Sequence, residues 1–205
     1  FVACEWIREQ YPKLKNYLLS GNFDTEKRTS AVNSLKGRGR RVTAEITIPR
    51  EVLERNLRIT PEAMHYGQGI TTLASFLTQS SNNAAHPANG LAALYLATGQ
   101  DIANIGESNQ CTTYNRVTRD GDYFFSVTLP ALIVASYGGG TNLPTQRECL
   151  QIMDCHGKGK ALKLAEIAAG LVVAGELSLG AATRVDKETR QNEWVDAHER
   201  LGRNR

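Results

Sequence analysis

The residues best suited to chemistry lie in one short segment near the start of the chain, residues 20–28. Its sequence, Ser-Gly-Asn-Phe-Asp-Thr-Glu-Lys-Arg, places two acids and two bases after a turn of small residues. A lysine ammonium beside a developing oxyanion stabilises it, and this contribution is often the largest single one in carbonyl chemistry. Taken alone, Lys27 is most simply a surface lysine in a polar loop. The segment therefore indicates an anion-handling loop and leaves the reaction open.

A second candidate is Asp101, which follows the predicted end of an apolar helix in the sequence Ala-Thr-Gly-Gln-Asp. An acid just beyond a helix C-terminus faces the negative end of the helix dipole, which is unfavourable by roughly 0.3–1 kcal/mol. A buried acid at this place would need a cationic partner, and a lysine is the natural one. The alternative is an exposed acid in a polar turn.

The third candidate is a run of glycines, residues 138–140, between Tyr137 and the sequence Thr-Asn-Leu-Pro. A glycine turn after a strand leaves backbone amides exposed, which suits anions and flat cofactors. The run is not a GxGxxG fingerprint, so it does not predict a Rossmann fold. A lone glycine triplet is weak evidence for any ligand.

Two histidines occur in patterns that could serve either structure or chemistry. His86 and Asn89 form a His-x-x-Asn pair, which more often caps a helix, and Pro87 between them is tolerated in a first helical turn. His198 lies in a charged tail, where composition alone predicts an exposed residue. An imidazole with a pKa near 6.5 is nevertheless suited to protonating a thiolate leaving group near neutral pH.

In chain order, these segments resemble the catalytic region of the 3-hydroxy-3-methylglutaryl-CoA reductase family. The matching patterns are Ser-Gly-Asn-x-x-Thr-Asp/Glu-Lys-Lys/Arg, His-x-x-Asn, Ala-Thr-Gly-Gln-Asp, Gly-Gly-Gly-Thr-Asn-Leu-Pro and Ala-His-x-x-x-Gly-Arg. The resemblance runs from about Trp6 to the end. It implies an α+β fold in which helices pack around a long central helix with a small sheet.

The resemblance also implies a role for each candidate. Lys27 would polarise the thioester carbonyl and hold the oxyanion, Asp101 would link that lysine to a glutamate, and His198 would protonate the departing CoA. A nicotinamide cofactor, NADPH, would contact Gly138, Gly139, Gly140, Thr141 and Asn142. The substrate would be bound by Ser20, Asn22, Glu26, Arg28, His86 and Asn89. No metal ligand set is expected.

The function implied is reduction of 3-hydroxy-3-methylglutaryl-CoA to mevalonate with two NADPH, by a homodimer or higher homo-oligomer whose active site lies at the interface. Three departures from the family keep an alternative open. Glu26 and Arg28 replace the usual Asp and Lys, and residues 67–72 lack a commonly present substrate-binding lysine. The family's glutamate also lies upstream of this segment. The alternative is a degenerate or divergent paralogue that binds a CoA-type ligand or reduces another acyl thioester.

Composition is that of an ordinary globular protein, with 41% hydrophobic and 22% charged residues and a net charge of +3 over 205 residues. Such a mild charge does not argue for nucleic-acid binding. Four dispersed cysteines without a CxxC motif favour reduced thiols and no structural zinc. Charges at Lys163, Glu166 and Glu176 interrupt the most apolar stretch, so we expect no membrane contact from this segment. We expect a cytoplasmic protein. An upstream membrane anchor stays open as an alternative.

The chain starts without Met, so we expect part of a longer polypeptide. Three parts are expected: residues 1–19, the end of the small cofactor-binding domain or its connecting helix; 20–183, the large CoA-substrate-binding catalytic domain; and 184–205, a mobile C-terminal segment that carries His198. Helices are predicted at 3–18 (ended or kinked by Pro12), 50–66 with a new start at Pro61, 88–98, 145–153, 161–182 and near 193–201. Strands are predicted at 41–49, 123–130 and 132–136. Helices and strands mixed without βαβ regularity indicate an α+β fold.

Overall fold

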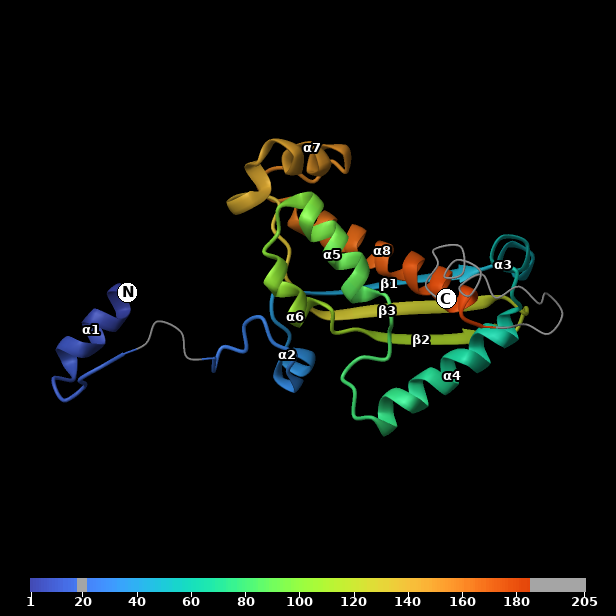
Figure 1. Ribbon diagram of the computed structural model, residues 1–205, viewed down its shortest axis with the longest axis horizontal. Helices are drawn as coiled ribbons and strands as arrows, with labels where there is room; N and C mark the ends of the chain where they lie inside the picture. Colours follow the sequence, from blue (N-terminus) through green and yellow to red (C-terminus); the bar gives the residue numbers. More distant parts are fainter. Residues whose placement is uncertain (18–21, 185–205) are drawn as a thin grey trace, which may run out of the picture.

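A computed structural model describes residues 1–17 and 22–184, and it is a mixture of helices with one small antiparallel sheet (Figure 1). The helices are α1 (Val2–Gln10), α2 (Ala31–Lys36), α3 (Arg50–Leu57), α4 (Pro61–Leu77), α5 (Pro87–Thr98), α6 (Ile105–Ser108), α7 (Pro144–Ile152) and α8 (Ala161–Ala182). Two 3₁₀ turns are η1 (Ile102–Asn104) and η2 (Gly139–Asn142). The predicted α+β class is confirmed at this level, whereas the three-part division of the chain stays a prediction.

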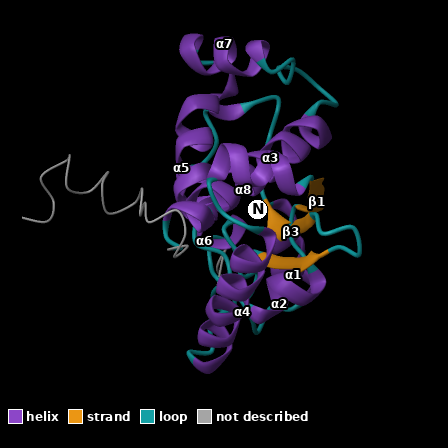
Figure 2. Cartoon of the chain, turned by 90° about the vertical axis from the view of Figure 1, so that its right-hand side faces the viewer, coloured by secondary structure: helices purple, strands orange, loops and turns teal. Residues whose placement is uncertain are grey.

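The sheet has three strands, β1 (Arg40–Ile48), β2 (Thr112–Val117) and β3 (Tyr123–Leu132), in the order β1-β3-β2. Alternate residues of β3 are buried, and α4, α5 and α8 gather on that side of the sheet (Figures 1 and 2). On the opposite face most outward side chains of β1 and β2 are exposed in the described part of the chain, and there Arg116 lies over the ring of Phe124. Pro130 falls where the β1–β3 register shifts, so this irregularity accommodates a residue that cannot donate to the ladder.

Helix α8 forms the centre of the core, as its apolar sequence predicts. Leu164, Ala168 and Val172 are fully buried in the core cluster. By length and apolarity alone α8 could also cross a membrane, but a core helix passes the same test and this one packs against β1, β3 and α5. A Cβ at Gly175 would lie 2.1 Å from the ring of His86, so α8 packs closely against the start of α5 there. At Gly170 a Cβ would meet nothing within 4 Å among the described residues.

One strand prediction is corrected by the structure, and one strand was not predicted. The segment 132–136 is not a separate strand, because β3 ends at Leu132 and side chains of α5 and of the turn after it satisfy the backbone that follows. Tyr95 Oη donates to the Ile133 carbonyl at 2.6 Å, and the Gln100 amide exchanges two hydrogen bonds with Ala135 at 2.7 and 2.8 Å. The sequence reasoning also missed β2, whose inward positions Thr113 and Asn115 are polar and so lack hydrophobic alternation.

Helix boundaries agree better with the sequence, because capping residues define them. The first helix ends at Gln10, before Pro12, and a new helix starts at Pro61 with the Thr60 hydroxyl accepting from Ala63 N at 3.2 Å. Helix α5 ends at Gly99, which adopts a left-handed conformation (φ 69°). Any helix near residues 193–201 lies outside the described residues.

Candidate functional site

The loop that carries Lys27 is held in an unusual backbone conformation. Thr25 and Lys27 both have positive φ, 58° and 60°, which non-glycine residues rarely adopt. The buried side chain of Asn33 stabilises this shape by donating to the carbonyls of Thr25 and Arg28, both at 3.1 Å. The Thr25 hydroxyl returns a hydrogen bond to Asn33 Oδ1 at 2.6 Å. Asn33, on the short helix α2, therefore fixes the conformation of the loop through these hydrogen bonds.

Lys27 and Asp101 meet although 74 positions separate them. Lys27 Nζ lies 2.8 Å from Asp101 Oδ2, so the expected pairing of these two side chains is confirmed. The hydrogen bond to Asp101 raises the pKa of Lys27, and the hydrogen bond from Lys27 lowers the pKa of Asp101. Each side chain remains about half exposed, 41% and 49%, so the pair is open to a ligand.

Asp101 also begins the 3₁₀ turn η1, a capping role that the sequence reasoning did not assign. Its Oδ1 accepts from Ala103 N at 3.0 Å, which is the second cause of its lowered pKa. The carboxylate therefore lies at the start of one helical turn as well as after the end of α5. This position offsets the unfavourable dipole of α5 and leaves Oδ2 free to face Lys27.

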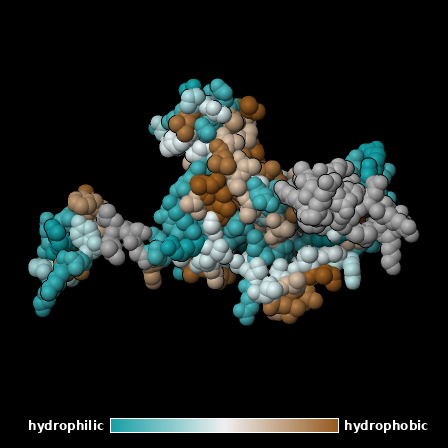
Figure 3. Space-filling view, viewed as in Figure 1, coloured by the Kyte–Doolittle hydropathy of each residue, from teal (hydrophilic) through white to brown (hydrophobic). Residues whose placement is uncertain are grey.

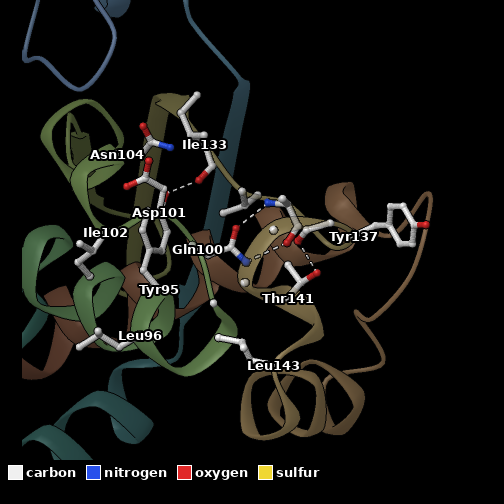
Figure 4. Close-up of a pocket in the computed structure, with 16 residues that line it drawn as sticks. Tyr95, Leu96, Gln100, Asp101, Ile102, Asn104, Ile133, Tyr137, Thr141 and Leu143 are labelled. Atoms are coloured by element: carbon white, nitrogen blue, oxygen red, sulfur yellow. Dashed lines mark hydrogen bonds between the residues drawn. The ribbon is translucent and has the colours of Figure 1, made fainter.

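A cavity of about 690 Å³ lies beside Asp101 and is bordered by the glycine turn (Figure 4). Its lining is mostly apolar and includes Tyr95, Leu96, Gly99, Gln100, Asp101, Ile102, Asn104, Ile133, Tyr137, Gly138, Gly139, Gly140, Thr141 and Leu143. Burial raises the pKa of Tyr95 to about 12, so its hydroxyl stays protonated and donates to Ile133. Four of the five predicted cofactor-binding residues thus border one cavity with Asp101.

Direct contact between two glycines brings these loops together. A Cβ at Gly99 would lie 2.3 Å from the Gly140 carbonyl oxygen, and a Cβ at Gly140 would lie 2.6 Å from the Gly99 oxygen. Any side chain at either position would push the Asp101 turn away from the glycine turn. At Gly138 and Gly139, in contrast, a Cβ would meet nothing within 4 Å, so the main chain there is open to a flat ligand.

The other charged residues of the loop surround Lys27 on its outer side. Asp24, Glu26, Lys27 and Arg28 line a second, shallow cavity of about 450 Å³. Arg28 Nη1 donates to the Glu26 carbonyl at 3.0 Å, and Arg38 Nη2 lies 3.8 Å from Glu26 Oε1. Glu26 and Arg28 therefore lie next to Lys27, where a substrate carboxylate or phosphate could reach them.

His86 and Asn89 lie at the other end of α5 from Asp101, and this helix of 12 residues is about 18 Å long at 1.5 Å per residue. His86 occupies the capping position, but its side chain makes no capping hydrogen bond. Glu176 of α8 takes that role by accepting from the Ala85 and His86 backbone amides, the first at 2.7 Å. His86 Nδ1 is buried without a partner in the described part of the chain, and Asn89 is exposed.

Some predicted residues cannot be placed at the site. Ser20 and His198 lie outside the described residues, and so does the tail that begins at residue 185. Asn22 has a positive φ of 67° at the edge of the loop, and no role follows from this. Asn142 is not part of the cavity lining, and its Oδ1 instead lies 3.2 Å from His156 Nε2.

Sequence reasoning missed three residues that build the site: Asn33, Gln100 and Glu107. Glu107 is fully buried, and its Oε1 accepts from Arg38 Nη1 at 2.6 Å and from Lys27 N at 3.2 Å. Gln100 and Glu107 bind the backbone of segments 35 and 80 residues away, whereas Asn33 binds carbonyls 5 and 8 residues before it. No helix or strand spacing marks these relations, and the sequence carries no signal that sets these three polar residues apart from exposed ones.

Together, these features define an α+β domain with a paired lysine and aspartate at the rim of a glycine-bordered cavity. The family profile described as hydroxymethylglutaryl-coenzyme A reductase matches residues 1–203. The chain therefore belongs to the hydroxymethylglutaryl-coenzyme A reductase family, as its motifs predict.

Named relatives agree with this assignment. The chain is 42% identical over 205 residues to the 3-hydroxy-3-methylglutaryl-coenzyme A reductase of Pyrococcus abyssi, covering 96% of this chain and 48% of that protein. It is 44% identical over 186 residues to the enzyme of the same name from Methanothermobacter thermautotrophicus, covering 90% and 45%. The match to the sea urchin Strongylocentrotus purpuratus enzyme is 36% over 191 residues, covering 88% and 20%. The chain thus spans about half the length of the archaeal relatives it matches.

Proposed function

We propose that this chain supplies the lysine–aspartate part of a reductase active site that converts 3-hydroxy-3-methylglutaryl-CoA to mevalonate in the mevalonate route to isoprenoids. The observation that carries the proposal is the Lys27–Asp101 contact at 2.8 Å beside a glycine-bordered cavity, in a chain of this family. The overall reaction adds two hydrides to the thioester carbon and one proton each to the alkoxide oxygen and the CoA sulfur.

Lys27 is the electrophilic group of this mechanism. Its ammonium would donate a hydrogen bond to the thioester oxygen and stabilise the negative charge that develops when the carbonyl is reduced. Asp101 would keep Lys27 protonated and orient it, because the carboxylate raises the pKa of the lysine. The neighbouring Glu26 and Arg28 would bind the substrate's polar groups, with Ser20 and Asn22 completing that loop.

The glycine turn fits a flat nicotinamide ring. Gly138 and Gly139 have open space where a Cβ would stand, and the cavity beside them has apolar walls. A reduced nicotinamide cofactor, which we propose to be NADPH, supplies hydride when it is bound there. Gly138–Gly140 and Thr141 would hold the ring through backbone contacts, and Asn142 would contribute from outside the cavity lining.

Two acid functions complete the proposal. His198, in the tail, would protonate the CoA sulfur as it leaves, and a glutamate outside these 205 residues would act with Asp101 at the aldehyde stage. We propose that this reaction takes place in the cytoplasm.

A second copy of the chain would bring His86 and Asn89 to the site. In one copy they lie at the far end of α5 from Asp101, so His86 and Asn89 of a second copy would have to reach Lys27 and Asp101 for all four to surround one acyl group. An exposed apolar stripe supports association: Tyr66, Ile70, Leu73 and Leu77 lie at helical spacing on α4 and are 52–73% exposed (Figure 3). We therefore propose a homodimer or higher homo-oligomer with an interfacial active site.

A degenerate or divergent paralogue is the second candidate. Arg28 stands where the family has lysine, and no lysine lies at residues 67–72, so the acyl-binding contacts differ. Such a protein would bind a CoA thioester without turnover, or reduce a different one.

The experiment that separates these candidates measures NADPH oxidation by the full-length protein with 3-hydroxy-3-methylglutaryl-CoA and with acetyl-CoA. Turnover with the first and little with the second is expected. Binding of the thioester without turnover would favour the paralogue. The His198→Gln variant should slow thioester reduction by about 10²–10⁴-fold while sparing reduction of free mevaldehyde, because only the first step has a thiolate leaving group.

A further inference from the structure

Glu107 is a buried carboxylate with an uncommon set of partners. Its side chain is fully buried at the centre of α6, and its Oε1 accepts hydrogen bonds from Arg38 Nη1 at 2.6 Å and from the Lys27 backbone amide at 3.2 Å. Oε2 is buried too and has no partner among the described residues. A buried carboxylate is retained only where paired groups compensate its desolvation, and here one of those groups is the main chain of Lys27.

The hydrogen bond from the Lys27 amide to Glu107 is made by a residue whose backbone conformation is unfavourable. Lys27 has a φ of 60°, a conformation that residues with a Cβ avoid. A hydrogen bond to its amide from a fixed acceptor favours this conformation over the extended alternatives. The direction of the Lys27 side chain, and hence its 2.8 Å contact with Asp101, depends on that backbone conformation.

Further contacts show that the first turn of α6 is fitted to this loop. The Thr29 hydroxyl donates to the Gly106 carbonyl at 2.8 Å. A Cβ on Gly106 would lie 2.5 Å from the Lys27 carbonyl oxygen, so only glycine allows the two backbones this close. Gly106 and Glu107 thus contact Lys27 on its carbonyl and amide sides.

Glu107 is too enclosed to react with a ligand itself. It does not line the cavity beside Asp101 or the shallow cavity around Lys27. Its exposed fraction is zero, whereas Lys27 and Asp101 are each about half exposed. The effect of Glu107 on a bound ligand must therefore pass through its two partners, Lys27 and Arg38.

We propose that Glu107 is a positioning residue that holds the Lys27 main chain in its left-handed conformation and so aims the Lys27 ammonium at Asp101 and the substrate carbonyl. Arg38 neutralises the buried charge of Glu107, and we call this arrangement of Arg38, Glu107 and the Lys27 amide the clamp. The importance of the clamp for turnover rests on the proposed reductase function, but the clamp itself can be tested without any reaction.

The direct test measures the pKa of Lys27 by NMR of the full-length protein carrying ¹³C-methylated lysines, with the Lys27 signal assigned from Lys27→Arg. Asp101 raises this pKa, while Glu26 and Arg38 act on it in opposite directions. Glu107→Ala should lower the pKa towards its ordinary value by releasing the loop. Glu107→Gln should stay near the wild type, because its amide oxygen can still accept from Lys27 N.

Two further variants keep this test decisive. Gly106→Ala changes no charge and displaces the Lys27 carbonyl, so it should lower the Lys27 pKa as Glu107→Ala does; it also replaces that variant if Glu107→Ala does not fold. Glu176→Ala removes another buried carboxylate that holds backbone amides, and it should leave the Lys27 pKa unchanged. An unchanged pKa in Gly106→Ala, or equal falls in Glu107→Gln and Glu107→Ala, would overturn the clamp.

The kinetic test separates this inference from the proposed function. In an active enzyme, Glu107→Ala should lower kcat on the order of 10²-fold with little change in KM, because a misaimed ammonium fails mainly in the transition state. Glu107→Gln should recover most of that loss. A wild type without reductase activity would refute the proposed function and leave the NMR result standing. An active wild type with undiminished kcat in Glu107→Ala would refute the clamp alone.

Discussion

The two ends of α5 carry different kinds of candidate site. At its C-terminal end, Gly99 leads directly to Asp101, which finds Lys27, the glycine turn and a cavity within the same chain. At its N-terminal end, the His86 backbone is held by Glu176 and its ring packs against Gly175, but among the described residues His86 and Asn89 meet no other predicted site residue. One end is therefore organised inside a single copy, and the other is closely packed but lacks its predicted neighbours among the described residues.

This contrast teaches that a motif residue can be well ordered and still lack its functional neighbours. The ring of His86 is packed tightly, yet its Nδ1 has no partner in the described segments. Lys27, in contrast, lies in a half-exposed loop and is already paired. Tests of the comparison should change one end at a time.

The largest effect is expected from Lys27→Ala. Loss of the ammonium removes the group that stabilises the oxyanion, so kcat for thioester reduction by the full-length protein should fall on the order of 10³-fold. Lys36→Ala, a lysine in the last turn of α2, is the matched control and should behave as wild type. Steady-state kinetics with the CoA thioester measure both variants, and a Lys27→Ala enzyme with normal kcat would refute the site at this end of α5.

Asp101→Asn should cost less, on the order of 10²-fold in kcat, because the lysine remains. Asp101 raises the pKa of Lys27, so its loss should lower that pKa. Since Lys27 acts in its protonated form, the alkaline limb of the pH–rate profile should then move to lower pH. Asp120→Asn, in an exposed turn, is the control. An alkaline limb at the same pH in Asp101→Asn would mean that the pair does not govern the protonation of Lys27.

Glu176→Ala tests the other end through stability. Two backbone amides at the start of α5 would lose their acceptor, which should lower the free energy of unfolding by about 1–3 kcal/mol. Glu166→Ala, an exposed position on the same helix, should change it by less than about 0.5 kcal/mol. Urea unfolding followed by circular dichroism gives both values, and equal stability of the two variants would contradict the capping role of Glu176.

Mixed oligomers of two variants should differ least from the wild type. They test directly whether the two ends of α5 contribute to the same active site from different copies. Lys27→Ala and His86→Ala should each be nearly inactive alone. Refolded together at equal amounts, they should regain about a quarter of wild-type activity, because half of the dimers are mixed and each holds one intact site of two. No recovery on mixing would place both residues in the same copy's site and would overturn the interfacial arrangement.

Much of this architecture follows from local sequence. Caps at Thr60 and Gly99, a proline at Pro61 and the apolar run of α8 each act within their own segment, so the helices were predictable. The Lys27–Asp101 pair could be anticipated because its two motifs match one family.

The rest depends on contacts that local sequence does not encode. Strand β2 was not predicted, because its inward residues Thr113 and Asn115 are polar. Their side chains form hydrogen bonds with Gln68 and His65 of α4. The segment after β3 was mistaken for a strand because its backbone partner is the side chain of Gln100. Glu107 was missed for a similar reason, since it holds a main chain 80 residues away, and Asn33 was missed because its side chain binds the loop before its own helix.

The contact between Gly99 and Gly140 has a consequence for engineering this protein. The spacing between the acid and the glycine turn is defined by main-chain atoms, which substitution does not replace. A library that randomises Leu96, Ile102 or Tyr137 can alter which acyl group or ring the cavity accepts. The same library leaves the distance between the Asp101 carboxylate and the glycine turn unchanged. New substrate specificities should therefore evolve there while the reacting groups keep their positions.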